Sequence, residues 1–281
     1  MAKKVKEPEY IPSQLNTPML NYRVYYMDFS EKILYAALSV AAGGAVGLVF
    51  YGNQFLDSQG FPTRATTIAN VVIFIIAGVA AMRFFLPLRA SQLCNSRRTQ
   101  LTTQFQSFLS SLSVALSSGM NMVESLSSAY NDLKLQYSAD AYIVKEVEEM
   151  MNGLHNGIDI ETMMKSLGER SMNEDINNFG LVFSMCYRTG GNLKDVVRRT
   201  SDIIGEKIEI NQEIETTLTS NKTQFMAMMV IPVVIIVMMR MMSSSFAAGF
   251  STIPGVIAMT VAIGMFAGAY ALAMKIMDVK G

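Results

Sequence analysis

The stretch ILYAALSVAAGGAVGLVFYGNQF, from Ile33 to Phe55, contains no Asp, Glu, Lys or Arg. A helix that crosses a bilayer needs roughly 20 apolar residues, and about 17 suffice at the short end. Three further runs without these charges are Ala65–Met82, Thr223–Met239 and Met241–Met274. The last run is too long for one span, and Pro254-Gly255 divides it into an outer loop and a span from Val256 to Met274. The sequence therefore predicts four membrane spans.

The spans form two pairs around a segment whose apolar residues recur at helical spacing. We predict an all-α membrane protein, with two spans before and two after a cytoplasmic six-helix bundle. The expected parts are an N-terminal tail (1–32), spans one and two (33–85), the helical domain (86–222), spans three and four (223–275) and a C-terminal tail (276–281). Thr17-Pro18 favours a short interfacial helix in the first tail, and a loose chain is the alternative.

Charge is divided unevenly along the chain and predicts its orientation. Leu101–Lys222 holds 17 acidic and 10 basic side chains, a net charge of −7. The whole chain has 23 acidic and 23 basic side chains, so 6 acidic and 13 basic side chains lie outside this segment, a net charge of +7. Basic residues flank the spans on one side, whereas the two expected outer loops hold only Arg64 and Arg240. Because Lys and Arg near spans mark the cytoplasmic side, both termini and the central domain are expected in the cytoplasm. A segment at −7 is a poor partner for nucleic acid.

The central segment reads as a succession of capped helices. Phe105, Phe108, Leu109, Leu112 and Leu116 form the first apolar stripe. Later helices are expected to begin at Asn121 (with Glu124), about Asp140, Asp159, Ser171 (with Glu174) and Asn192 (with Asp195). The last meets no breaker other than Gly205 before Lys222, so we expect it to continue into the third span. No period-2 pattern persists, so no sheet is expected.

Enzyme chemistry has no visible residue set. No G-x-x-x-x-G-K-[ST] loop is present, His155 is the only histidine and sits at an expected helix end, and Cys94 and Cys186 are far apart. We therefore expect no catalytic, cofactor or metal site and no disulfide. The spans lack ionisable residues inside them, which disfavours a small-solute transporter or channel, the main alternative. A membrane-bound enzyme is a third alternative.

Small residues and one proline mark the spans. Gly43 with Gly47, and Gly264 with Gly268, each form a G-x-x-x-G pattern that allows close helix packing, within one protomer or between protomers. Pro232 lies inside the third span and predicts a kink, either structural or a flexing point.

Two charged clusters are candidates for partner docking. They are the acidic trio Glu146, Glu148 and Glu149 and the basic trio Lys194, Arg198 and Arg199. A solvated helix face is the simpler interpretation of each.

Three segments carry a resemblance to a known family: LSSGMNMVESL (Leu116–Leu126), MNGLHNGIDIETMM (Met151–Met164) and FGLVFSMCYRTGGNLKDVV (Phe179–Val197). Their succession resembles the F domain of type II secretion and type IV pilus systems, an inner-membrane platform superfamily. RTGGNL is the most specific piece. Because the chain has one such domain with two spans on each side, it is most similar to the shorter TadB and TadC proteins of tight-adherence pili.

The resemblance implies a non-enzymatic platform in the inner (plasma) membrane that couples a cytoplasmic secretion ATPase to pilin movement. The partners it implies are that ATPase, a second platform protein or a second copy, pilin subunits and membrane lipid. It implies a structural role for five residues at turn positions: Gly119, Gly153, Gly190, Gly191 and Asn192. We hypothesise that the acidic domain docks in the ATPase pore and that its turning lifts pilins from the bilayer.

Overall fold

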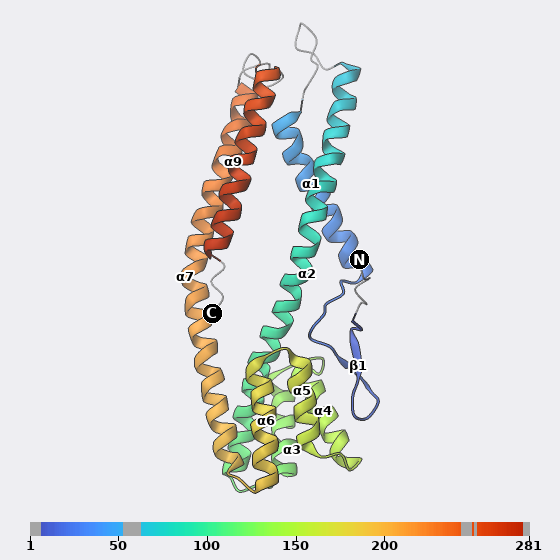
Figure 1. Ribbon diagram of the computed structural model, residues 1–281, viewed down its shortest axis with the longest axis vertical. Coiled ribbons are helices and arrows are strands. Elements are labelled where there is room, and N and C mark those ends of the chain that lie inside the picture. The colour runs from blue at the N-terminus through green and yellow to red at the C-terminus, as the bar shows by residue number, and fades with distance from the viewer. Residues whose placement is uncertain (1–6, 53–62, 243–248, 250–251, 278–281) are drawn as a thin grey trace. The chain divides into compact units, whose positions relative to one another are not determined.

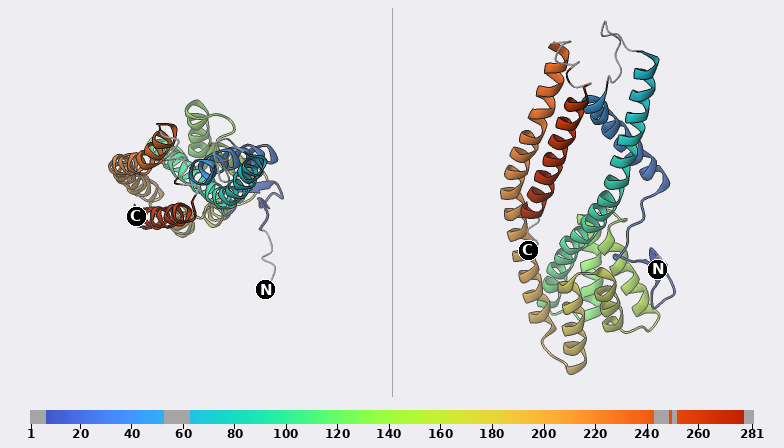
Figure 2. Two further views of the ribbon diagram at one scale, coloured as in Figure 1. Left: turned by 90° about the horizontal axis from the view of Figure 1, so that it is seen from above. Right: turned by 45° about the horizontal axis from the view of Figure 1, so that its top comes forward.

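The computed structural model describes residues 7–52, 63–242, 249 and 252–277, and divides the chain into two compact units (Figures 1 and 2). The core unit comprises Met1–Tyr26 and Ala90–Ile210, and the span unit comprises Met27–Arg89 and Asn211–Gly281. Each unit has its own packing and is described separately.

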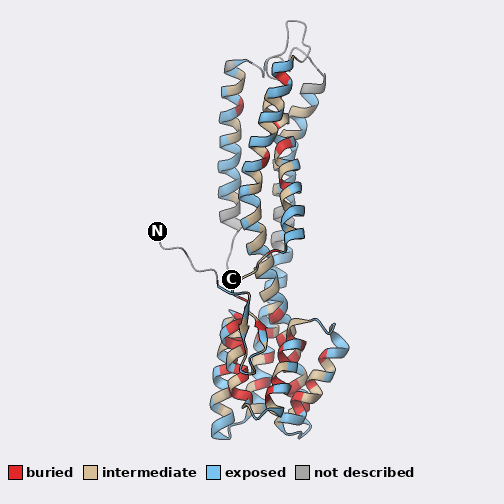
Figure 3. Ribbon diagram, turned by 90° about the vertical axis from the view of Figure 1, so that its right-hand side faces the viewer, coloured by how far each residue is buried: buried red, intermediate tan, exposed pale blue. Residues whose placement is uncertain are grey.

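The core unit is a bundle of helices around one apolar core. It contains the end of α2 (Arg64–Ser117), then α3 (Met122–Gln136), α4 (Tyr142–His155), α5 (Ile160–Ser171), α6 (Glu174–Thr189) and the beginning of α7 (Leu193–Met242). Buried residues concentrate on the inward faces of these helices (Figure 3). The rings of Phe105 and Phe179 meet edge to face at 5.5 Å, the geometry that aromatic quadrupoles favour. The helical pattern read from the sequence thus corresponds to a real apolar core.

The side-chain caps agree with the sequence at α3 and α7, whereas α4 and α5 begin without a side-chain cap hydrogen bond. The expected capping box of α3 is confirmed, because Asn121 and Glu124 bond each other's backbone N–H groups. The sequence predicts Ser171 as the N-cap of α6, and this prediction was wrong. Met172 turns the chain with a left-handed φ of 54°, and Asn173 instead accepts from the N–H groups of Asp175 and Ile176.

A two-stranded hairpin replaces the expected loose tail or interfacial helix. Strand β1 (Tyr10–Pro12) pairs antiparallel with β2 (Pro18–Leu20), so the expectation of no sheet was also wrong. Proline lacks the N–H that a helix interior requires, and Pro12 and Pro18 face each other in the last pair of the ladder, next to the turn. Farther along, Tyr22 belongs to the apolar core, so this N-terminal segment is part of the core unit.

The span unit consists of long apolar helices. They are α1 (Phe29–Tyr51), the first part of α2, the later part of α7 and α9 (Ile253–Met277). By length and composition, α1, a stretch within α2 and Pro254–Ala273 of α9 are candidate membrane spans. The apolar stretch Thr223–Met239 of α7 is shorter. Several helices are therefore apolar enough to cross a membrane.

Two helices pass without a break from one unit to the other. Helix α7 continues from Leu193 to Met242, as the sequence predicts, and Pro232 lies within it. Helix α2 continues from Arg64 to Ser117 with Pro87 inside, so the second apolar run and the first helix of the core form one rod. Each proline removes one backbone hydrogen-bond donor without ending its helix.

Glycines allow α1 and α2 to approach closely. A Cβ added at Gly43 would overlap the Cβ of Ala81, and one at Gly47 would lie 2.6 Å from the Cβ of Ala77. In contrast, a Cβ at Gly264 or Gly268 meets no described atom within 4 Å. The first G-x-x-x-G pattern thus packs within the chain, whereas the second faces outward from its own chain.

This contrast predicts unequal effects of the same substitution. Gly43→Ile should destabilise the span unit by about 1–3 kcal/mol, because overpacking forces the two helices apart. Gly264→Ile is the matched control and should leave the unfolding midpoint of the detergent-solubilised monomer unchanged. Equal losses in thermal unfolding of the two variants would contradict the packing of α1 on α2.

Candidate functional site

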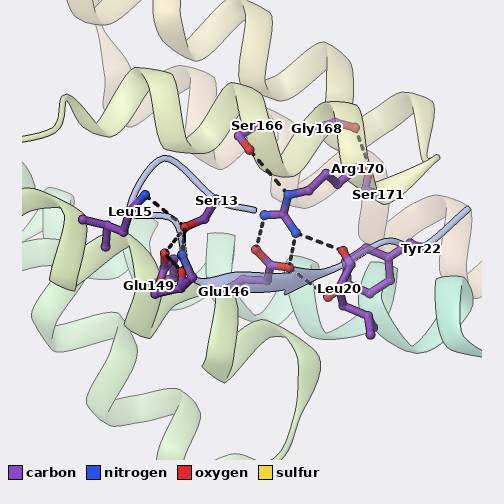
Figure 4. A network of polar contacts seen from close by, with 11 residues as sticks. Ser13, Leu15, Leu20, Tyr22, Glu146, Glu149, Ser166, Gly168, Arg170 and Ser171 are labelled. Carbon is purple, nitrogen blue, oxygen red and sulfur yellow. Dashed lines mark hydrogen bonds and ion pairs between the residues drawn. The ribbon is translucent and has the colours of Figure 1, made fainter. Parts of the chain in front are cut away.

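A buried ion pair lies where α4 and α5 meet the N-terminal segment (Figure 4). Two parallel hydrogen bonds join the side chains, from Arg170 Nη1 to Glu146 Oε1 at 2.8 Å and from Nη2 to Oε2 at 2.6 Å. Both side chains are almost fully buried, with Glu146 2% and Arg170 9% exposed. A bidentate guanidinium–carboxylate pair combines charge with fixed geometry, so it locks α4 to α5.

The same ion pair holds the N-terminal segment. Arg170 Nη1 also donates to the backbone carbonyl of Leu20 at 3.1 Å, and the Tyr22 hydroxyl donates to Glu146 Oε1 at 3.1 Å. Burial first, and then the Glu146 carboxylate, raise the pKa of Tyr22 well above its ordinary value, so the phenol stays a donor. We call Leu20, Tyr22, Glu146 and Arg170 the clasp.

Burial lowers the pKa of Arg170, but its hydrogen bonds with Glu146 and the charge of that carboxylate outweigh this effect and raise the pKa above its ordinary value. The guanidinium therefore stays charged inside the bundle. Every hydrogen-bonding atom of the Glu146 carboxylate has a partner, which is the condition for keeping a charge pair in a core.

Two further contacts fasten the segment beside the clasp. The hydroxyls of Ser13 and Thr17 both donate to Glu149 Oε1 on α4. On α2, Arg98 donates to the carbonyls of Tyr22 at 2.9 Å and Arg23 at 3.1 Å. The N-terminal segment is thus fixed to α2, α4 and α5 before α1 begins at Phe29.

The acidic trio does not form one exposed face. The expectation of a solvated docking residue was wrong for Glu146, which is buried because Arg170 compensates its charge. Glu149 is half-buried and holds the hairpin, so only Glu148 is exposed. The pattern E-x-E-E marks charge but does not show which carboxylate has a buried partner 24 residues away.

The basic trio lies on the exposed surface of α7. Lys194, Arg198 and Arg199 are all exposed in the first two turns after the α6–α7 connection. We call these three residues the basic face. They are near the connection in sequence and therefore lie at one end of the core unit.

The RTGGNL segment forms a compact helix-to-helix turn. Gly190 has a φ of 67°, which favours glycine, and the Gly191 N–H donates to the Cys186 carbonyl at 2.8 Å. Asn192 Oδ1 then accepts from the Asp195 N–H at 3.3 Å. Gly119 similarly ends α2 with a φ of 86°. The turn expected at Gly153 was wrong, because this residue lies inside α4 and a Cβ there would overlap the Met163 side chain of α5.

Catalytic groups do not gather in the described part of the chain. Among those residues no three His, Cys, Asp or Glu side chains are placed to hold a metal ion. His155 Nδ1 lies 2.7 Å from the Met151 carbonyl at the end of α4, and Cys94 and Cys186 are both free thiols.

Sequence reasoning missed the other half of the clasp. Arg170, Tyr22 and Leu20 gave no local signal, because their roles depend on contacts between segments up to 150 residues apart.

These features define a helical protein with several candidate membrane spans and a compact helical unit that continues into them through α2 and α7. Residues 108–240 match the model of the family "Type II secretion system (T2SS), protein F". The match begins near the end of α2, covers the rest of the core unit and includes the apolar stretch of α7. It supports the platform superfamily of type II secretion and type IV pilus systems, whose members are generally non-enzymatic inner-membrane proteins. No curated protein and no solved structure is significantly similar to the chain.

Proposed function

We propose that the protein is a non-enzymatic inner-membrane platform of a Tad-type pilus or type II-like secretion machine. It couples a cytoplasmic secretion ATPase to the extraction and assembly of pilin subunits. The observation that carries this proposal is the continuity of α2 and α7, each of which runs unbroken from the core unit into an apolar stretch.

Continuous helices are suited to passing a displacement along their axes. A helix rises about 1.5 Å per residue, so the part of α7 from Ile210 to Thr223 is about 20 Å long. Because the backbone hydrogen bonds run along the axis, rotation or displacement of the core would move both rods together. A flexible connection would dissipate the same movement.

The N-terminal segment supplies a third connection. The clasp holds Leu20 and Tyr22 within the core unit, and α1 begins only a few residues later, at Phe29. Movement of the core would therefore reach α1 through a short, anchored piece of chain. This favours the clasp as a structural support for coupling.

The basic face is the surface that we propose for the ATPase. Its three cations are exposed, although the segment Leu101–Lys222 that contains them has a net charge of −7. They therefore form a local positive site that an acidic partner could bind. Charge complementarity raises association rates and fixes register. Glu148 remains an exposed acidic candidate, whereas Glu146 is removed from the docking proposal by its burial.

Charge reversal tests this docking surface. Lys194→Glu, Arg198→Glu and Arg199→Glu together should lower co-purification of the ATPase at least ~10-fold, because like charges across an interface cost several kcal/mol. Reversal of Lys134 and Lys165, which are exposed elsewhere on the core, is the matched control. Normal ATPase recovery and normal piliation with the reversed trio would exclude this face.

The full topology and assembly complete the proposal. Four spans with both termini in the cytoplasm agree with the distribution of Lys and Arg around the apolar runs. The outward-facing pair Gly264 and Gly268 would pack against a second copy or a TadB–TadC-like partner, with pilins and lipid around them.

A further inference from the structure

The core unit contains a pocket between the hairpin, α2 and α4. Its volume is about 220 Å³, and its lining includes Tyr10, Arg97, Tyr142 and Lys145. The pocket is separate from the basic face on α7. The proposed coupling between the ATPase and the pilins does not use this pocket.

Hydrogen-bond donors dominate this pocket. Arg97 is 11% exposed, and its Nε and Nη1 atoms are buried without an acceptor in the structure. Its Nη2 has only a long contact with Glu9, at 3.6 Å, and its guanidinium carbon lies 4.5 Å from the centre of the Tyr25 ring. An almost fully buried guanidinium with unused N–H groups is costly unless something supplies acceptors.

The surrounding polar groups include three further donors, on Tyr10, Tyr142 and Lys145, and two carboxylates, those of Asp140 and Glu146, which already bind other side chains. In the described part of the chain, the hydroxyls of Tyr10 and Tyr142 have no hydrogen-bond partner that would compete for them. Lys145 Nζ contacts Asp140 at 2.9 Å and keeps two N–H groups. The nearby carboxylate of Glu146 is already occupied by Arg170 and Tyr22.

We propose that this pocket binds a small phosphate ester, with Arg97 and Lys145 holding the phosphate and the two tyrosine hydroxyls adding hydrogen bonds. A phosphate offers several oxygen acceptors and negative charge, which the unpaired N–H groups of Arg97 require. Sites for drug-sized ligands span about 300–1,000 Å³. The smaller volume here fits a phosphate with a few carbon atoms and disfavours a whole nucleotide.

The source of the phosphate is either a soluble ester or the headgroup of an anionic lipid. Full-length protein in detergent would be titrated with glycerol 3-phosphate and followed by phosphorus NMR. The same protein in nanodiscs of phosphatidylcholine with phosphatidylglycerol would be analysed by native mass spectrometry, which counts retained anionic lipids. Binding in the first arm indicates a soluble ester, and binding in the second arm alone indicates a headgroup.

Arg97→Gln should weaken binding about 10-fold to 100-fold, as expected for a hydrogen bond between charged groups. Lys145 is 55% exposed, so Lys145→Gln should keep the fold and still weaken binding measurably. Tyr142→Phe removes only the hydroxyl, and Lys165→Gln on the surface of α5 is the control. Absence of binding in both arms, or wild-type affinity in both the Arg97 and the Lys145 variants, would overturn the site.

Discussion

Replacing Arg170 with alanine is expected to destabilise the core unit by about 3–5 kcal/mol, because Glu146 then remains buried without a counter-charge. The Leu20 carbonyl loses its donor at the same time. The N-terminal segment should detach, and trypsin should cleave after the exposed Arg23 much faster than in the wild type. Tyrosine near-ultraviolet circular dichroism during urea unfolding would measure the loss of stability, since the chain has no tryptophan.

A triple replacement separates buried charge from lost packing. Glu146→Leu, Arg170→Met and Tyr22→Phe together remove the ion pair and the phenol that would otherwise be left without an acceptor. Buried ion pairs replaced by apolar groups of similar volume often leave stability unchanged or improved. A triple variant as unstable as Arg170→Ala would mean that packing, and not the uncompensated charge, accounts for the loss.

A flexible insertion in α7 is expected to abolish pilus assembly while leaving both units folded. The insertion would place about seven Gly and Ser residues, two helical turns, after Glu213, which lies beyond the contact of Lys207 with Asp175 at 2.8 Å. Glycine-rich segments behave as flexible coils, so the rod would no longer transmit movement. ATPase co-purification should persist because the basic face is untouched. Piliation would be counted by electron microscopy in a strain that lacks the native gene.

The matched control has the same length but keeps the rod. An alanine-rich insertion of about seven residues preserves helical stiffness and nearly the same angular phase, since about 3.6 residues make one turn. This variant should retain much of the assembly activity. If the flexible and the helical insertions both assemble pili normally, α7 is not the route of coupling.

Local patterns in the sequence were sufficient to locate the helices of the core. The Asn121–Glu124 capping pair and the glycines at 119 and 190 act within a few residues, so their structural effect follows from neighbours in the chain. The continuous helix from Leu193 followed from the absence of a breaker. The continuity of α2 was missed, because Pro87 and four arginines after the second apolar run resemble a helix end, although a proline can be accommodated inside a long helix.

Long-range contacts limited what could be predicted about the candidate surface. The exposed cluster expected at Glu146 is instead half of a buried pair, because Arg170 and the N-terminal segment cover it. The basic face stayed exposed, since no acidic side chain lies within ion-pair distance of Lys194, Arg198 or Arg199 in the described structure. Burial of a charge depends on a distant partner, and helical periodicity carries no information about that partner.

The most direct measurement follows the apolar stretch of α7 while the ATPase works. A nitroxide attached to a cysteine at position 227, in a variant with Ala227→Cys, Cys94→Ser and Cys186→Ala, would report on this stretch in nanodiscs. Coupling through α7 predicts that its electron paramagnetic resonance spectrum changes during ATP turnover and that the change disappears with the flexible insertion. An identical spectrum with and without ATP turnover, while the ATPase remains bound, would contradict the platform function.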